Sequence, residues 1–167
     1  MRFDKFTIKS QELIQQAQSI ASRHANQQIE TVHLLAAMLN EKEGVARTML
    51  RKLGVSPNTI FNEAVMAIDR LPKISGAADL YLSANTKRIL ESAFSEADKL
   101  KDEYVSVEHI LLAVVDETGD GAGNLLRRYG VPRDAVLKVM KEIRGSQRIT
   151  DPNPEEKYQA LDKFSRD

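Results

Sequence analysis

The sequence contains no cysteine and no excess of charge of either sign. Without cysteine the chain can form no disulfide framework, no thiol nucleophile and no cysteine-based metal site. This composition suits a reducing cytoplasm, and we expect a cytoplasmic protein. Lys+Arg and Asp+Glu are equal at 24 each, so the basic surplus that neutralises phosphates in nucleic-acid binders is missing. We therefore expect no nucleic-acid partner.

Long hydrophobic runs are also missing. The longest, "LLAAML" (34–39) and "ILLAVV" (110–115), are far shorter than the roughly 20 residues needed to cross a bilayer. The opening "MRFDKFTIKSQELIQQ" has no apolar segment of the kind found in secretory signals. These features predict a soluble protein with no membrane partner. At 167 residues, the chain is long enough for one domain with a real core and a modest tail.

An internal duplication organises the chain. When the sequence is shifted by 76 residues, 7–67 aligns with 83–143 without a gap, and twelve of the 61 positions are identical. A two-copy repeat of this kind indicates a duplicated structural unit. The identical pairs are Ala17/Ala93, Ser19/Ser95, Ala21/Ala97, His33/His109, Leu35/Leu111, Ala37/Ala113, Glu41/Glu117, Ala46/Ala122, Leu50/Leu126, Arg51/Arg127, Gly54/Gly130 and Val55/Val131.

Each copy shows the pattern of four helices. Apolar residues recur at helical spacing after Thr7 and after Ser83, which are well placed as N-caps. Residues 31–40 and 107–116 are apolar almost all round, as in a helix at the centre of a bundle. The third helices (about 44–53 and 120–129) end at glycines that can take the left-handed conformation, and a fourth stripe follows each. We predict an all-α fold of eight helices without strands, as two tandem four-helix repeats related by a pseudo-twofold axis.

The domain boundaries follow from this pattern. Repeat one covers about 7–68, a linker with proline and glycine covers 69–82, and repeat two covers about 83–144. The predicted domain is therefore 1–144. Residues 145–167 are polar, contain two prolines and end in mid-pattern, and we expect them to be a linker toward a further module of a longer protein.

Two of the three histidines occupy equivalent places in the repeat, His33 and His109. Each lies about three residues into a buried helix, where its ring can bond backbone groups left free at the helix start. A metal site would need a third ligand, but His24 has Leu100 as its counterpart and "EHILL" lacks the second histidine of a zinc motif. The pattern favours a structural role. "GDGAG" (119–123) follows a helix rather than a strand and lacks the lysine of a phosphate loop, which predicts an interhelical turn.

Acids present in only one copy are the more informative group. Asp102, Glu103 and Glu108 have no acidic counterpart in the first copy, and they surround Tyr104 in "KDEYVSVEH". Two interpretations stay open, a solvated turn or an acidic rim on an apolar groove suited to extended segments with basic and hydrophobic side chains. A hydrolase using Glu108 and His109 is disfavoured because no nucleophile, metal or oxyanion device accompanies them. We expect no enzymatic activity in these residues.

The two copies together resemble a known module. "FTIKSQELIQQAQSIASRHANQQIETVHLLAAML" and "YLSANTKRILESAFSEADKLKDEYVSVEHILLAVV", followed by "LRKLGV" and "LRRYGV", resemble the double Clp N-terminal repeat that opens the Clp class of AAA+ unfolding machines. The resemblance covers essentially the whole chain. "LPKISG" and "EEKYQALDKFSRD" are most similar to the ClpB disaggregases rather than to ClpA or ClpC.

The resemblance implies a substrate-recruiting domain that binds unfolded or aggregated polypeptide weakly, through an apolar groove with an acidic rim. The alternative is an adaptor-docking domain of a ClpA- or ClpC-type unfoldase. ATP and Mg²⁺ would belong to modules outside this chain, which is expected to hold no cofactor or metal. The parent would be a homohexamer working with a DnaK-type chaperone, and the fragment a monomer. Ser92 and His109 stand where a more apolar groove lining is expected. The candidate binding residues are Thr7, Leu90, Asp102, Tyr104 and Glu108.

Overall fold

The computed structural model describes residues 2–76, 79–145 and 148–155. The predicted end of the tail, 156–167, lies outside these residues. Eight α-helices are present in the described part of the chain, and the all-α fold of two four-helix repeats is confirmed. The elements are a 3-10 turn (Phe3–Lys5), α1 (Ile8–Arg23), β1 (Gln28–Ile29), α2 (Thr31–Asn40), α3 (Val45–Lys52), α4 (Pro57–Asp69), β2 (Tyr81–Leu82), α5 (Ala84–Lys99), α6 (Val107–Val115), α7 (Ala122–Arg128) and α8 (Arg133–Arg144).

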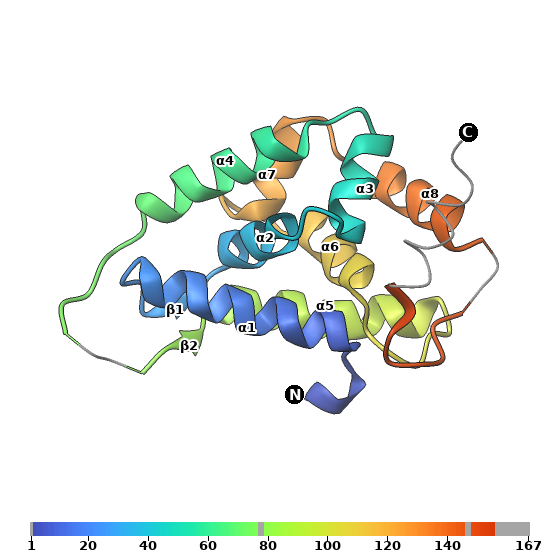
Figure 1. The fold of residues 1–167 in the computed structure, drawn as a ribbon, viewed down its shortest axis with the longest axis horizontal. Helices are drawn as coiled ribbons and strands as arrows, with labels where there is room; N and C mark the ends of the chain where they lie inside the picture. The colour runs from blue at the N-terminus through green and yellow to red at the C-terminus, as the bar shows by residue number, and fades with distance from the viewer. Residues whose placement is uncertain (1, 77–78, 146–147, 156–167) are drawn as a thin grey trace.

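The two apolar helices form the centre of the molecule. Helices α2 and α6 lie in the middle, with α1 and α5 along one side and α3, α4, α7 and α8 along the other (Figure 1). All of α2 except its last residue, and all of α6, are buried. Helix α3 packs on α6 of the other repeat, and α7 packs on α2 in the same way. The repeats therefore share one core.

The helix ends confirm the capping predictions. The side chain of Thr7 accepts a hydrogen bond from the backbone N of Ser10 (3.1 Å), and the side chain of Ser83 accepts one from Thr86 (3.1 Å). After α3 and α7 the chain turns through glycines with φ of +77°, the left-handed conformation that favours glycine. None of the helices in the described ranges is long and apolar enough to cross a membrane.

The expectation of no strand is wrong in one detail. β1 and β2 pair in parallel, with Ile29 opposite Leu82, and Phe6 forms an isolated bridge with Val105. Shifted by 76 residues, Phe6 corresponds to Leu82 and Ile29 corresponds to Val105, so one contact is made twice across the pseudo-twofold axis. Such short pairings leave no alternating pattern in the sequence.

The structural role predicted for the two histidines is confirmed. The backbone N of Glu30 donates to Nδ1 of His33 (2.8 Å), and the backbone N of Ser106 donates to Nδ1 of His109 (2.9 Å). Each ring therefore satisfies a donor at the start of its helix. Burial, with a smaller contribution from the charge of His24, lowers the pKa of His33 to about 4. This ring is consequently neutral at neutral pH.

Residues 119–121 form the predicted interhelical turn, whereas 122–123 already belong to α7. Gly121 and Gly123 make room for a buried acid. Glu117 accepts hydrogen bonds from Thr31 Oγ1 (2.9 Å), from the backbone N of Gly123 (2.9 Å) and from Asn85 Nδ2. Thr31 belongs to repeat one and Asn85 to repeat two. This carboxylate therefore joins the two repeats, a role that the sequence analysis did not foresee.

Gly123→Ala is expected to lower the free energy of unfolding by about 1–3 kcal/mol, the usual cost of overpacking a filled interior. A Cβ at this position would lie 2.4 Å from the backbone oxygen of Val114, so the backbone has to shift. Urea unfolding followed by circular dichroism measures the effect. Gly44→Ala is the control and is expected to cost less. Its Cβ would lie 3.1 Å from the backbone oxygen of Glu41, so a small shift is enough to accommodate it. Equal costs for the two variants would contradict this explanation.

Candidate functional site

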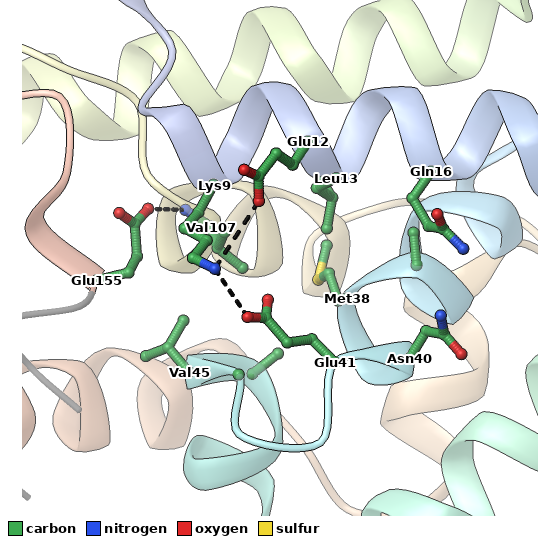
Figure 2. Close-up of a pocket in the computed structure, with 13 residues that line it drawn as sticks. Lys9, Glu12, Leu13, Gln16, Met38, Asn40, Glu41, Val45, Val107 and Glu155 are labelled. Carbon is green, nitrogen blue, oxygen red and sulfur yellow. Dashed lines mark hydrogen bonds and ion pairs between the residues drawn. The ribbon is translucent and has the colours of Figure 1, made fainter.

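A pocket of about 190 Å³ opens between α1, the end of α2 and the start of α3 (Figure 2). Apolar side chains form much of its lining, and polar side chains from α1 and from the α2–α3 turn stand around them. Figure 2 shows Glu155 at one end of the pocket and Gln16 and Asn40 at the other. The lining consists of Lys9, Glu12, Leu13, Gln16, Ala37, Met38, Asn40, Glu41, Gly44, Val45, Ala46, Val107 and Glu155.

The charges around the pocket are mainly acidic. Lys9 Nζ lies 2.9 Å from a carboxylate oxygen of Glu41 and 3.8 Å from one of Glu12, as the dashed lines in Figure 2 show. Glu155 adds a third carboxyl group to the same lining. An apolar surface bordered by three acids and one lysine is complementary to a chain segment with hydrophobic and basic side chains.

The end of the pocket at Glu155 joins the two repeats. Thr7 Oγ1, at the N-cap of α1, donates to Glu155 Oε1 (2.7 Å), and the backbone N of Val107, at the start of α6, donates to the same oxygen (3.2 Å). Both donors belong to helix N-termini, which favour a carboxylate or another acceptor. The two donors together bind one side-chain oxygen.

Thr7 and Glu108 are the predicted residues that the structure brings to this end of the pocket. Thr7 is fully buried beneath Glu155. Glu108 is also buried, in the first turn of α6 beside Val107, and its charge is close enough to raise the pKa of Glu155. A direct role of these two residues in client binding stays a prediction.

The other three predicted residues lie elsewhere. Leu90 is fully buried in the core on α5. Asp102 is buried between helices, and Tyr104 is half-buried with Lys5 Nζ 5.9 Å from its ring centroid. The solvated-turn interpretation is therefore wrong for Asp102 and Glu108, although Glu103 is exposed. The part of Leu90, Asp102 and Tyr104 in client binding stays a prediction.

Asp102 is the centre of a buried ionic network. His109 Nε2 lies 2.8 Å from Asp102 Oδ2, and Arg144 Nη1 donates to the same oxygen at 2.8 Å. Burial alone would raise the pKa of Asp102, but the hydrogen bonds from His109 and Arg144 outweigh it and hold that pKa well below its usual range. In repeat one the counterpart of Asp102 is the uncharged Asn26. Its Oδ1 lies 3.0 Å from Nε2 of His33.

Most residues that line the pocket are not among the candidates predicted from the sequence. A difference between the two copies of the repeat could have indicated them. The counterpart of Glu41 is Glu117, which closes the equivalent position in repeat two against the glycines of α7. In repeat one Val45 replaces Gly121, and Glu41 stays on the surface with Lys9. Comparing the two copies position by position would have indicated that one site is filled and the other open.

Comparisons with known proteins agree with this fold. The family described as the Clp repeat (R) N-terminal domain matches residues 5–129. The chaperone protein ClpB of Bacillus cereus is 39% identical over 171 residues, covering 100% of this chain and 20% of that protein. ClpB of Clostridium perfringens is 36% identical, covering 98% of this chain and 20% of that protein. The chain thus spans about a fifth of the length of these curated relatives.

Solved structures show the same architecture. The Hsp104 N-terminal domain of Candida albicans superposes with a TM-score of 0.80 at 23% identity, covering 90% of this chain and 99% of that one. The N-terminal domain of the ClpD chaperone from Arabidopsis thaliana has a TM-score of 0.64 at 25% identity, covering 84% and 97%. A ClpV N-domain solved in complex with a VipB peptide has a TM-score of 0.66 at 17% identity, covering 83% and 86%.

Proposed function

The chain belongs to the family of Clp repeat N-terminal domains, and from this premise we propose that it recruits unfolded or aggregated polypeptides to a protein disaggregase. The observation that carries the proposal is the pocket between α1, α2 and α3, which reaches Val107 of repeat two and whose apolar surface is bordered by Glu12 and Glu41. Such a surface matches the hydrophobic and basic side chains that unfolded chains expose. It demands no particular sequence, as suits a recruiter of many clients.

The proposed binding is weak. A small apolar contact contributes only a few kcal/mol at about 25 cal/mol per Å², whereas association costs an estimated 4–15 kcal/mol. The dissociation constant is then micromolar or weaker for one domain. Several tethered copies on one assembly would raise the effective affinity without new contacts, and weak single contacts allow the client to be released.

The proposal extends to the parent protein. We infer that it is a cytoplasmic AAA+ homohexamer that works with a DnaK-type chaperone, and that ATP and Mg²⁺ bind in its ATPase modules. The described residues contribute recognition, and we expect no ATP hydrolysis by this domain alone. The relatives that carry the name ClpB support this inference.

An NMR titration of the ¹⁵N-labelled domain with a permanently unfolded protein tests the proposed function. The expected result is a cluster of amide shifts at Leu13, Met38, Val45 and Val107, with a micromolar or weaker dissociation constant. Removing the acidic border with Glu12→Gln and Glu41→Gln together is expected to weaken binding of a lysine-rich client about fivefold, because each exposed charge pair contributes up to about 1 kcal/mol.

The matched control removes the same charge from distant exposed positions, with Glu91→Gln and Glu142→Gln on α5 and α8. This pair is expected to bind as the wild type does. Absent or scattered shifts would contradict the proposed function. Capture of a single folded protein at one-to-one stoichiometry, without binding of unfolded chains, would instead support the adaptor-docking alternative.

A further inference from the structure

The chain segment 148–155 packs against residues 102–103 and the start of α1, and its last residue, Glu155, lines the end of the pocket at which the repeats meet. The backbone N of Glu103 donates to Ile149 O (2.8 Å), the backbone N of Ile149 donates to Asp102 Oδ1 (2.9 Å), and the backbone N of Ile8 donates to Pro152 O (2.8 Å). The side chain of Ile149 is fully buried. Figure 1 shows the segment beside the start of α1. It is therefore held through backbone bonds and one apolar anchor.

The other end of the segment is held by a buried carboxyl group. Glu155 is 2% exposed, and its Oε1 accepts hydrogen bonds from Thr7 and Val107. Its Oε2 has no hydrogen-bond partner among the described residues, and the same is true of Oε1 of Glu108, which is 1% exposed. The charge of Glu108 disfavours a second negative charge on Glu155, and a proton on Glu155 removes that repulsion.

The positive charges on the neighbouring helices pair with other acids. On α1, Lys9 directs its ammonium group to Glu12 and Glu41, although it lines the same pocket. Arg144 on α8 is paired with Asp102. Burial, followed by the charge of Glu108, raises the pKa of Glu155 to about 7, although the hydrogen bonds from Thr7 and Val107 act in the opposite direction.

We propose that residues 148–155 are a displaceable internal ligand of the client-binding site, and that a proton on the buried carboxyl group of Glu155 holds this cover in place. The proposal rests on the proposed function, since it identifies the competitor that a client has to displace. It also makes client access depend on pH. The geometry that carries it is the set of backbone bonds, the buried Ile149 and the buried carboxyl group of Glu155.

The direction of the pH effect follows from linkage. The pKa of Glu155 is about 7 when the cover is docked and close to the ordinary 4.5 when it is released. Docking is therefore strongest below pH 4.5, weakens as the pH rises toward 7, and stays at its weakest above that. Between pH 6 and pH 8 the docking equilibrium is expected to weaken about tenfold.

The test uses the full chain and two independent measurements. The methyl resonance of Ile149 reports whether the cover is docked, and titration with a permanently unfolded protein reports access to the site. In the wild type, Ile149 is expected to move toward its released position between pH 6 and pH 8, while client affinity rises up to about tenfold. Glu155→Gln, whose amide oxygen can still accept from Thr7 and Val107, is expected to stay docked and to bind clients weakly at both pH values.

Two further variants keep the test decisive. Ile149→Ala removes the apolar anchor and is expected to bind client about three- to tenfold more tightly than the wild type at pH 6, corresponding to loss of a few buried methyl groups from the cover. Glu142→Gln, on the exposed face of α8, should keep the wild-type pH dependence.

Each failure has a distinct meaning. Equal client affinity in the wild type and Ile149→Ala would overturn the cover as a competitor. Unchanged pH dependence in Glu155→Gln would overturn the role of the proton on Glu155. Absence of client binding in every variant would overturn the proposed function, and the Ile149 resonance would still show whether the segment docks.

Discussion

Replacing Asp102 with alanine is expected to lower the free energy of unfolding by about 3–5 kcal/mol, the usual cost of removing one partner of a buried ion pair. Arg144 is 7% exposed and would be left as a buried cation facing the space of the lost carboxylate. His109 would lose its second hydrogen-bond partner. The segment that contains Ile149 would lose one of its backbone contacts as well. Urea unfolding at pH 7 measures the change.

The duplication supplies the matched control for this prediction. Asn26 is the counterpart of Asp102 and bonds His33 as Asp102 bonds His109. It carries no charge, so Asn26→Ala, which also removes the hydrogen bond from Asn26 Nδ2 to Pro72 O, should cost only about 1–3 kcal/mol, the range for a neutral buried group left unsatisfied. Equal costs for the two variants would show that the ion pair with Arg144 adds nothing, and would contradict the prediction.

The Asp102 network also has a predictable response to acid. Its hydrogen bonds hold the pKa of Asp102 below the ordinary value. The stabilisation is therefore fully present above the unfolded-state pKa of about 3.9 and is lost as the pH falls below it. The cover at Glu155 responds in the opposite sense, because the raised pKa of Glu155 makes docking stronger in mild acid. Between about pH 4.5 and 6, the cover should therefore stay docked while the hydrogen bonds of Asp102 remain intact.

The fold could be predicted because its determinants are local and occur twice. Thr7 and Ser83 precede the apolar stripes of α1 and α5, and Gly54 and Gly130 follow α3 and α7, so these helix ends are marked in the sequence. The two buried helices are apolar all round, which indicates the centre of a bundle without any knowledge of the neighbours. Shared residues such as His33 and His109 could be assigned to structure because both copies need them.

The site was less predictable because it depends on contacts distant in sequence. Asp102 lies in a polar stretch of the sequence that is typical of a surface turn. In the structure it is paired with Arg144, which lies 42 residues further along the chain. Glu155 meets Thr7 across 148 residues, and no local pattern links a polar tail to a helix cap. Leu90 follows the core-facing stripe of α5, and the resemblance alone assigned it to a groove. Differences between the copies, rather than their identities, mark the places where the structure departs from simple symmetry.

Replacing Glu117 with alanine is expected to lower the free energy of unfolding by about 3–5 kcal/mol, because two buried donors and one half-buried donor lose their acceptor and each buried unsatisfied group costs about 1–3 kcal/mol. These donors are the hydroxyl of Thr31, the amide of Asn85 and the backbone N of Gly123. Two of them belong to different repeats, so the change also loosens the packing of one repeat on the other. Amide hydrogen exchange in α2 and α7 should rise together.

Glu41 is the counterpart in repeat one and provides the control for the Glu117 variant. Its side chain is 48% exposed and is paired with Lys9, the counterpart of Asn85. Exposed pairs of this kind contribute about 0–1 kcal/mol, so Glu41→Ala should leave the unfolding midpoint nearly unchanged. A small effect at Glu117, or a comparable one at Glu41, would contradict the view that the same acid joins the repeats in one copy and borders an open pocket in the other. Glu117→Ala is expected to cost more than Glu41→Ala because Glu117 is buried and Glu41 is exposed. The two residues are of the same type and occupy the same place in the repeat.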